Sequence, residues 1–164
     1  MIPISDINPA KRTPYITRFF IFFTVVVYII LQPKDSSDLF NFFYEFSAIP
    51  CEIQKGVPLS ANQFYTNNCM ANVDYVIFND KNIIFSLVTA NFLHANLLHL
   101  VGNLWSFWIF GNNIEDKLGI FKFNIFLVIA GAGSIGTHIF LNYSDLIPIV
   151  GSSGIVSALM AAYL

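Results

Sequence analysis

The chain has 164 residues, of which 55% are hydrophobic and only 11% are charged, and its mean hydropathy is +0.63. A water-soluble domain of this length needs more charge to cover its surface, so the composition indicates a membrane protein surrounded by a lipid bilayer. The formal net charge is −2, and the basic residues do not cluster with aromatic side chains. This pattern argues against nucleic acid as a partner.

The first apolar segment covers residues 15–32, enough to cross about 27 Å as a helix. It follows a head, residues 1–14, that carries Lys11 and Arg12, and no small-residue cleavage site comes after it. Basic residues favour the cytoplasmic side of a membrane. We therefore predict an uncleaved first span with a cytoplasmic N-terminal segment, in the cell membrane, which is the inner membrane for a bacterial source.

Residues 33–82 form a polar stretch with six acidic residues against three lysines, which suits an outer loop. Within it, NFFYEF (residues 41–46) is amphipathic, so we expect interfacial helices in this loop. Cys51 and Cys69 both fall here. An extracytoplasmic location would allow a disulfide between them, but two cysteines are a weak signal and their pairing stays open.

Three further apolar segments follow, which we predict to span the membrane as helices. The second covers residues 83–110 and is expected to end at the polar run GNNIEDKLG, the third covers about 121–140, and the fourth begins within IVGSSGIVSALMAAYL. The predicted fold class is all-α, a polytopic helical membrane protein. Residues 131–136, GAGSIG, match a dinucleotide-binding pattern but lack a preceding strand, so we interpret the small residues Ala130, Ala132, Ser134 and Gly136 as helix-packing positions.

A few polar side chains interrupt these apolar segments and are the candidates for chemistry: His94, His99, Asn103, His138 and Ser153. His99 and Asn103 are four residues apart and share a helix face, whereas His94 is expected to precede that helix. The histidine spacing makes a poor ligand set, so no metal site is predicted. Hydrogen bonding between helices, as in a structural or transport subunit, is the alternative interpretation.

The stretch Gly-Ser-Ser-Gly at residues 151–154 places a hydroxyl at the start of the fourth helix. Gly151 permits backbone angles that other residues avoid, and Gly154 allows a close approach. The free N–H groups and positive end of a helix favour a developing anion, so Ser153 is well placed for nucleophilic attack. His99 and Asn103, as neutral donors, are suited to complete an oxyanion hole.

Three motifs in this order resemble those of the rhomboid intramembrane serine proteases: HANLLHLVGN, FGNNIEDKLG and VGSSG, preceded by a head, MIPISDINPAKRTPYIT, that is also similar. The resemblance implies a rhomboid-like bundle of six spans, of which four are present and the fourth is incomplete. It implies that Ser153 is the nucleophile and that His99, Asn103 and the Ser153 N–H form the oxyanion hole. His94 and Glu115, by the same resemblance, support the architecture.

The resemblance also implies that transmembrane segments of other proteins are the substrates and that no cofactor is needed. It places the general base, a histidine, on the sixth span, which we expect beyond Leu164, and it gives His138 no such role. Residues 83–164 are thus expected to be a C-terminally incomplete rhomboid protease domain, inactive alone. Phe85-Ser86 stands where some members carry Trp-Arg. The competing hypothesis is an inactive rhomboid-like protein or fragment that binds transmembrane helices.

Overall fold

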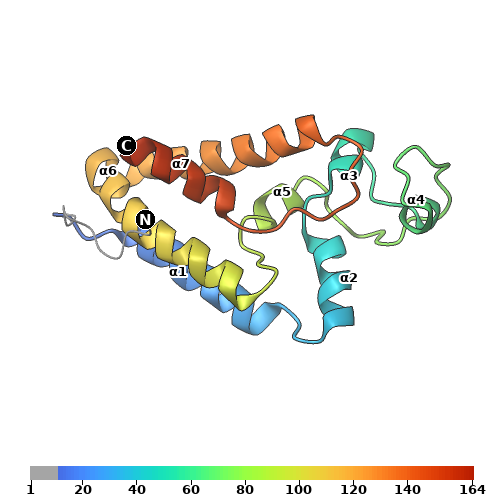
Figure 1. Cartoon of the computed structure of the whole chain (residues 1–164), viewed down its shortest axis with the longest axis horizontal. Helices are drawn as coiled ribbons and strands as arrows, with labels where there is room; N and C mark the ends of the chain where they lie inside the picture. The colour runs from blue at the N-terminus through green and yellow to red at the C-terminus, as the bar shows by residue number, and fades with distance from the viewer. Residues whose placement is uncertain (1–10) are drawn as a thin grey trace.

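The computed structural model describes residues 11–164, so the first ten residues of the predicted N-terminal segment lie outside it. The described chain is all-helical (Figure 1) and its extended pairing is limited to two isolated bridges, which confirms the predicted fold class. Its elements are α1 (Tyr15–Val26), the π-helical turn η1 (Val27–Leu31), α2 (Ser36–Phe46), α3 (Pro50–Lys55), α4 (Ala61–Thr66), α5 (Ser86–Thr89), α6 (Leu97–Leu141) and α7 (Ser153–Tyr163).

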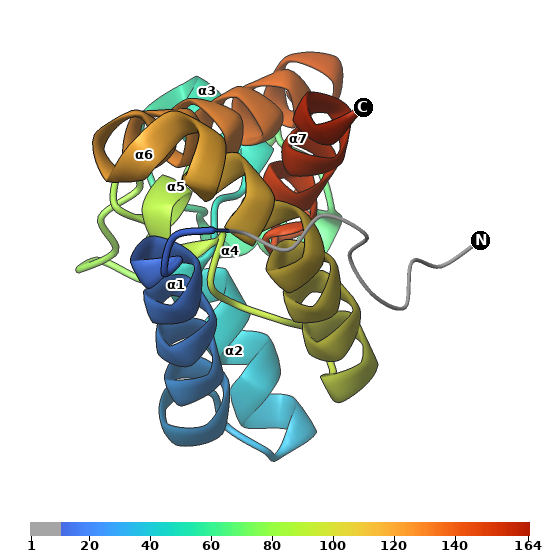
Figure 2. The same ribbon diagram turned by 90° about the vertical axis from the view of Figure 1, so that its left-hand side faces the viewer.

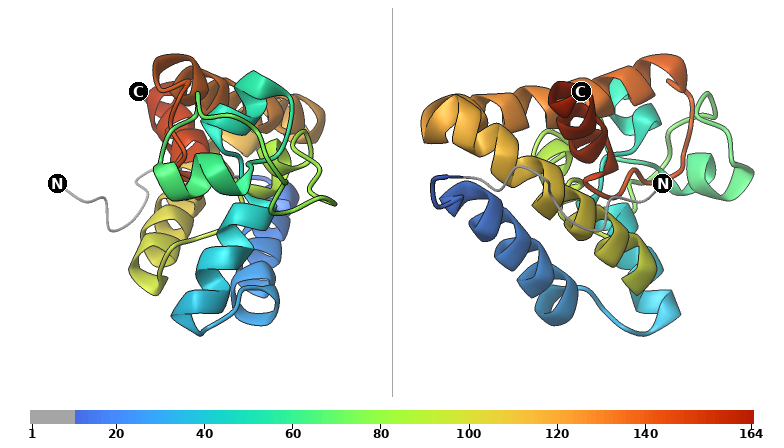
Figure 3. Two further views of the ribbon diagram at one scale, coloured as in Figure 1. Left: turned by 90° about the vertical axis from the view of Figure 1, so that its right-hand side faces the viewer. Right: turned by 60° about the vertical axis from the view of Figure 1, so that its left-hand side comes forward.

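Helix α6 bends sharply at one glycine and thereby sets the shape of the molecule. Gly119 has φ 75° and ψ 165°, which divides the 45-residue helix into a first arm, residues 97–118, and a second arm, residues 120–141. The two arms form a V, and α1 lies beside the first arm (Figures 1 and 2). Helix α7 lies between the two arms (Figure 3) and runs toward the bend (Figure 1). The ring of Tyr163, near its end, has its centroid 5.2 Å from that of Phe110 in the first arm.

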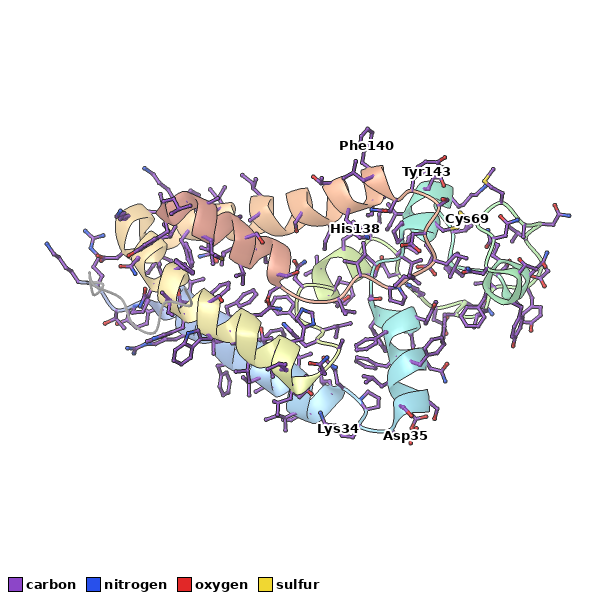
Figure 4. All side chains as sticks on the ribbon, viewed as in Figure 1. Lys34, Asp35, Cys69, His138, Phe140 and Tyr143 are labelled. Carbon is purple, nitrogen blue, oxygen red and sulfur yellow. A yellow bond between two sulfur atoms is a disulfide. The ribbon has the colours of Figure 1, made fainter. Side chains whose placement is uncertain are left out.

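The body of the molecule, α1, η1, α6 and α7, buries aromatic rings and exposes many others. Phe20 of α1 stacks on Phe107 of α6 with ring centroids 4.3 Å apart. In contrast, Phe140 is 82% exposed and points away from the body (Figure 4), and Phe121 is 78% exposed. Among the described helices, α6 is long and apolar enough to cross a membrane, while Tyr15–Leu31 and α7 are shorter apolar helices. A surface this apolar fits a lipid environment.

The prediction that the second apolar helix begins at residue 83 is wrong. Only the four-residue α5 forms in this region, and α6 begins at Leu97, where the Asn96 side chain accepts a hydrogen bond of 2.8 Å from the His99 N–H. The intervening backbone is irregular because its polar groups bind elsewhere: the Gln32 side chain binds both main-chain groups of His94.

The polar run GNNIEDKLG does end the first arm, but only at its last residue, Gly119, rather than after residue 110 as predicted. The polar side chains find partners without interrupting the helix: Glu115 accepts hydrogen bonds from the start of α1, and Asn113 donates back to the Ile109 carbonyl. The break comes only at Gly119, whose positive φ other residues rarely adopt. The predicted third span agrees well with the second arm, residues 120–141.

Small residues bring α7 against the second arm of α6, where Ser134 is one of the predicted helix-packing positions. A Cβ added to Gly154 would lie 2.2 Å from Oγ of Ser134, so only glycine fits there. Two other predicted packing positions, Ala132 and Gly136, are exposed within the described chain. A Cβ at Gly136 would meet nothing within 4 Å.

Residues 33–82, called the cap below, form a second, smaller unit that holds α2, α3 and α4 at the end of the body opposite the α6 bend (Figure 1). The structure contains the disulfide left open by the sequence, between Cys51 and Cys69. The buried Lys81 and Glu52 form an ion pair of 2.5 Å. Ile149, the first residue of the stretch predicted to start the fourth span, pairs with Ala48, so the cap is joined to the segment that leads into α7.

Candidate active site

The turn before α7 requires a glycine for two reasons. Gly151 has φ +107°, in the region that favours glycine. A Cβ at this position would also lie 2.7 Å from Cε1 of His99, far inside van der Waals contact. The Gly151 N–H donates a hydrogen bond of 2.8 Å to the Ala90 carbonyl, which ties the turn to the end of α5. The turn is therefore fixed in direct contact with the first arm of α6.

Ser153 is the first residue of α7, as predicted, and its side chain is exposed. The first hydrogen bond of the helix runs from the Val156 N–H to the Ser152 carbonyl, at 2.9 Å. The N–H groups of residues 153–155 therefore precede the intrahelical bonds, and no described side chain caps this helix end. Because the positive end of the helix dipole adds to these donors, the turn is suited to hold an oxyanion next to the Ser153 hydroxyl.

His99 and Asn103 come to this turn from one face of the first arm of α6. His99 lies against Gly151, and the Asn103 amide nitrogen would be 3.5 Å from a Cβ at Gly151. Asn103 is buried and His99 is half-buried. The structure thus brings together His99, Asn103, Gly151 and the start of α7, four of the features that the sequence singled out.

His94 lies in the loop before α6, as predicted, and is completely buried. Its Nδ1 is 3.2 Å from the Phe92 carbonyl, and its Nε2 is 3.1 Å from the Asn103 amide nitrogen. Because a carbonyl only accepts, Nδ1 carries the proton and Nε2 accepts a hydrogen bond from Asn103. The His94 ring therefore fixes which way the Asn103 amide points.

Gln32 is the site residue that the sequence analysis missed. Gln32 directly follows η1 and is 3% exposed. Its side-chain Nε2 donates a hydrogen bond to the His94 carbonyl, and its Oε1 accepts one from the His94 N–H, both at 2.9 Å. The available signal was a polar side chain at the end of an apolar segment, directly before Pro33. Such a residue is expected to face water, so its pairing with a residue 62 positions away was not predicted.

Two other polar candidates lie away from Ser153. Glu115 sits near the α6 bend, 16 residues and about 24 Å of helix beyond His99. There its buried carboxylate accepts hydrogen bonds of 2.8–2.9 Å from the Ile16 N–H and from the N–H and hydroxyl of Thr17. His138 is exposed in the last turn of α6 (Figure 4), and in the described chain its ring makes no hydrogen bond to Ser153.

Among residues 11–164, no group of three or more His, Cys, Asp or Glu side chains is arranged to hold a metal ion. The groups that the structure gathers at this site are the Ser153 hydroxyl, the Asn103 amide, the His99 imidazole and the start of α7.

The sequence model of the rhomboid domain matches residues 81–164, about half of the chain. The chain belongs to the rhomboid family. This confirms the family resemblance and the assignment as a rhomboid-like helical membrane protein. The matched region contains the Gly151 turn, His94, His99, Asn103 and Ser153.

Curated relatives agree with this assignment. The rhomboid is similar to RHOMBOID-like protein 6, mitochondrial, of Arabidopsis thaliana, with 39% identity over 79 residues, which are 48% of this chain and 25% of the relative. It is 28% identical over 146 residues to RHOMBOID-like protein 4 of the same plant, covering 87% of this chain and 35% of the relative. The chain thus spans about a quarter to a third of these relatives. No solved structure matches it significantly.

Proposed function

We propose that this rhomboid is an intramembrane serine endopeptidase that hydrolyses peptide bonds in or near transmembrane helices of other membrane proteins, with Ser153 as the nucleophile. The observation that carries the proposal is the exposed Ser153 at the uncapped start of α7, beside the donors His99 and Asn103. Family membership supports the reaction class.

In the proposed reaction the Ser153 Oγ attacks the carbonyl carbon of the scissile peptide bond. The oxyanion that forms accepts hydrogen bonds from the Ser153 N–H, His99 and Asn103, where one well-placed donor accelerates the reaction about 10²–10³-fold. The general base that takes the hydroxyl proton is a histidine outside these 164 residues. When the tetrahedral intermediate collapses, the C–N bond breaks, the histidine gives this proton to the leaving amine, and water then hydrolyses the acyl ester on Ser153. His94 does not serve, because both of its ring nitrogens are engaged.

We propose further that Tyr15–Leu31 and the two arms of α6 cross the cell membrane, with the N-terminus cytoplasmic, and that the 11-residue α7 begins a fourth span. Charge at the α6 bend supports this orientation. The main-chain N–H groups of Lys11 and Arg12 bond to the Asp116 carboxylate, which lies next to Lys117, so several basic residues gather at the bend. Basic residues mark the cytoplasmic side, and the cap would then lie on the opposite side.

The test uses the protein encoded by the complete reading frame, purified into lipid vesicles with a transmembrane reporter substrate. The wild type is expected to cleave the reporter and to be labelled at Ser153 by a fluorophosphonate probe. Ser153→Ala should abolish both, while Ser157→Ala, one turn further along the same helix, should retain them. Labelling that persists in Ser153→Ala would contradict the proposal. A wild type that binds the reporter helix without cleavage or labelling would instead establish the inactive, helix-binding alternative.

A further inference from the structure

We propose that Gln32 is a positioning residue for the oxyanion hole, acting on Asn103 through His94. The inference rests on the proposed function for its catalytic consequence, but the structural relay itself is independent of it. The side chain of Gln32 reaches from the end of the first apolar helix to the loop before α6.

The first step of the relay is a two-point attachment. A carboxamide presents one donor and one acceptor side by side, which matches the C=O and N–H of a single residue. Gln32 uses both, each at 2.9 Å, to hold the main chain of His94. A carboxylate lacks the donor, asparagine is one methylene shorter, and methionine offers neither bond, so the attachment depends on glutamine.

The second step passes from the backbone of His94 to its ring. The Phe92 carbonyl, 3.2 Å from Nδ1, fixes the tautomer so that Nε2 accepts from Asn103 Nδ2 at 3.1 Å. One N–H of the amide is thereby directed at His94, and the other stays available to the oxyanion, since the nitrogen would lie only 3.5 Å from a Cβ at Gly151. A shift of the His94 backbone would rotate the donor that the oxyanion needs, and small misplacements of catalytic groups are costly.

All three members of the relay are buried, which makes their geometry well defined. Gln32 is 3% exposed, His94 is fully buried and Asn103 is 7% exposed. Buried polar groups that lose their partners are expensive, so the three side chains should behave as one unit, with strongly non-additive mutational effects.

The kinetic test compares Gln32→Met with the wild type, using the complete protein in lipid vesicles. Because an oxyanion contact forms fully only in the transition state, kcat should fall about 10–100-fold with little change in KM. In an Asn103→Ala background, Gln32→Met should cause less than a twofold further loss. Equal losses in both backgrounds, or a change confined to KM, would overturn the positioning role.

The chain offers a matched control, Gln63→Met. Gln63 is also a buried glutamine with two hydrogen bonds, from the Ser60 N–H and to the Cys69 carbonyl, but it lies in the cap. The Gln63→Met variant should keep kcat within about twofold of the wild type. A fall in kcat equal to that of Gln32→Met would overturn the proposal. Should Gln32→Met fail to fold, Gln32→Glu, which keeps the acceptor for the His94 N–H but loses the donor to its carbonyl, should lower kcat several-fold with little change in KM, and a wild-type kcat would overturn the proposal.

A spectroscopic measurement separates this inference from the proposed function. If the wild type neither cleaves nor labels, the proposed function fails, but the side-chain ¹⁵N resonances of His94 and Asn103 still report the relay. Gln32→Met should shift both, while Gln63→Met should shift neither. Unchanged resonances in Gln32→Met would overturn the relay whatever the activity of the protein.

Discussion

The cap and the body of this rhomboid place polar and apolar side chains in opposite ways. The cap is held by a disulfide, a buried ion pair and a helix capping box, the devices of a small domain in water. The body exposes large apolar side chains such as Phe121 and Phe140, while Thr17, His94 and Glu115 are buried. A polar group inside an apolar body is costly unless it is paired, so the paired polar groups of the body mark its architecture and its candidate site.

The largest stability effect is expected in the body, for Glu115→Ala. The substitution leaves the N–H groups of Ile16 and Thr17 and the Thr17 hydroxyl without their acceptor, in a region where Thr17 is fully buried. At about 1–3 kcal/mol for each orphaned group, the free energy of unfolding should fall by about 5 kcal/mol. Thermal unfolding of the protein solubilised in a mild detergent, monitored by circular dichroism, measures the change in the free energy of unfolding.

The neighbouring carboxylate supplies the control. Asp116 accepts hydrogen bonds from the N–H groups of Lys11 and Arg12 at the surface, where water can replace it. Asp116→Ala should therefore cost less than about 1 kcal/mol. Similar losses for both variants would mean that burial of Glu115 is not what makes it important.

In the cap, the largest effect is expected for Lys81→Met. Burial raises the pKa of the Glu52 carboxyl and lowers that of the Lys81 ammonium, because each charge loses solvation, while their mutual attraction opposes both shifts. Removing one partner leaves an uncompensated buried charge and should cost about 3–4 kcal/mol. Glu52→Gln combined with Lys81→Met should recover much of this loss, and the exposed Lys55→Met should stay within about 0.5 kcal/mol of the wild type. Chemical denaturation of the four proteins makes the comparison.

A third prediction concerns the boundary between the two regions. The Cys51 N–H donates to the Asp145 carbonyl at 3.0 Å, and Leu146 shares a buried cluster with both cysteines. Replacing both cysteines by serine should destabilise the cap by about 2–3 kcal/mol. Hydrogen exchange measured by mass spectrometry should show faster exchange in residues 48–70 and 142–150 and unchanged exchange in both arms of α6. Uniform loss of protection would show that cap and body unfold as one unit.

The sequence predicted those features of the body that depend on local pattern. The apolar segments at residues 15–32 and about 121–140 predicted helices close to where the structure has them, and the spacing of His99 and Asn103 placed both on one face, as observed. Gly151 and Ser153 were assigned to a turn and a helix start from the same local reasoning, and the structure agrees. These features follow from residues within a few positions of each other.

The features that failed depend on partners far along the chain. GNNIEDKLG was expected to end the helix from its first residue, yet residues 111–118 stay helical, and within them Glu115 accepts a hydrogen bond from the N–H of Thr17, 98 residues away. The helix start at Leu97 and the role of Gln32 share one cause, a bond across 62 residues that keeps the His94 backbone irregular. The hydrophobic periodicity of one segment carries no information about a hydrogen bond to a distant segment. The two cysteines, in contrast, are visible in the sequence and suggested a disulfide as one possibility.

The smallest effect is expected for Ser60→Ala, which removes one capping bond at the start of α4. Ser60 Oγ accepts from the Gln63 N–H at 3.3 Å, and the Gln63 side chain accepts from the Ser60 N–H at 3.1 Å. Loss of an N-terminal capping bond costs about 1–2 kcal/mol. Both residues are buried, so water does not replace the lost acceptor and the cost should lie near about 2 kcal/mol. Thermal unfolding of Ser60→Ala measures this loss, with the exposed Thr66→Ala as control. A loss no larger than that of Thr66→Ala would show that the capping box does not help to hold the cap together, and that its stability comes from the disulfide and the buried ion pair.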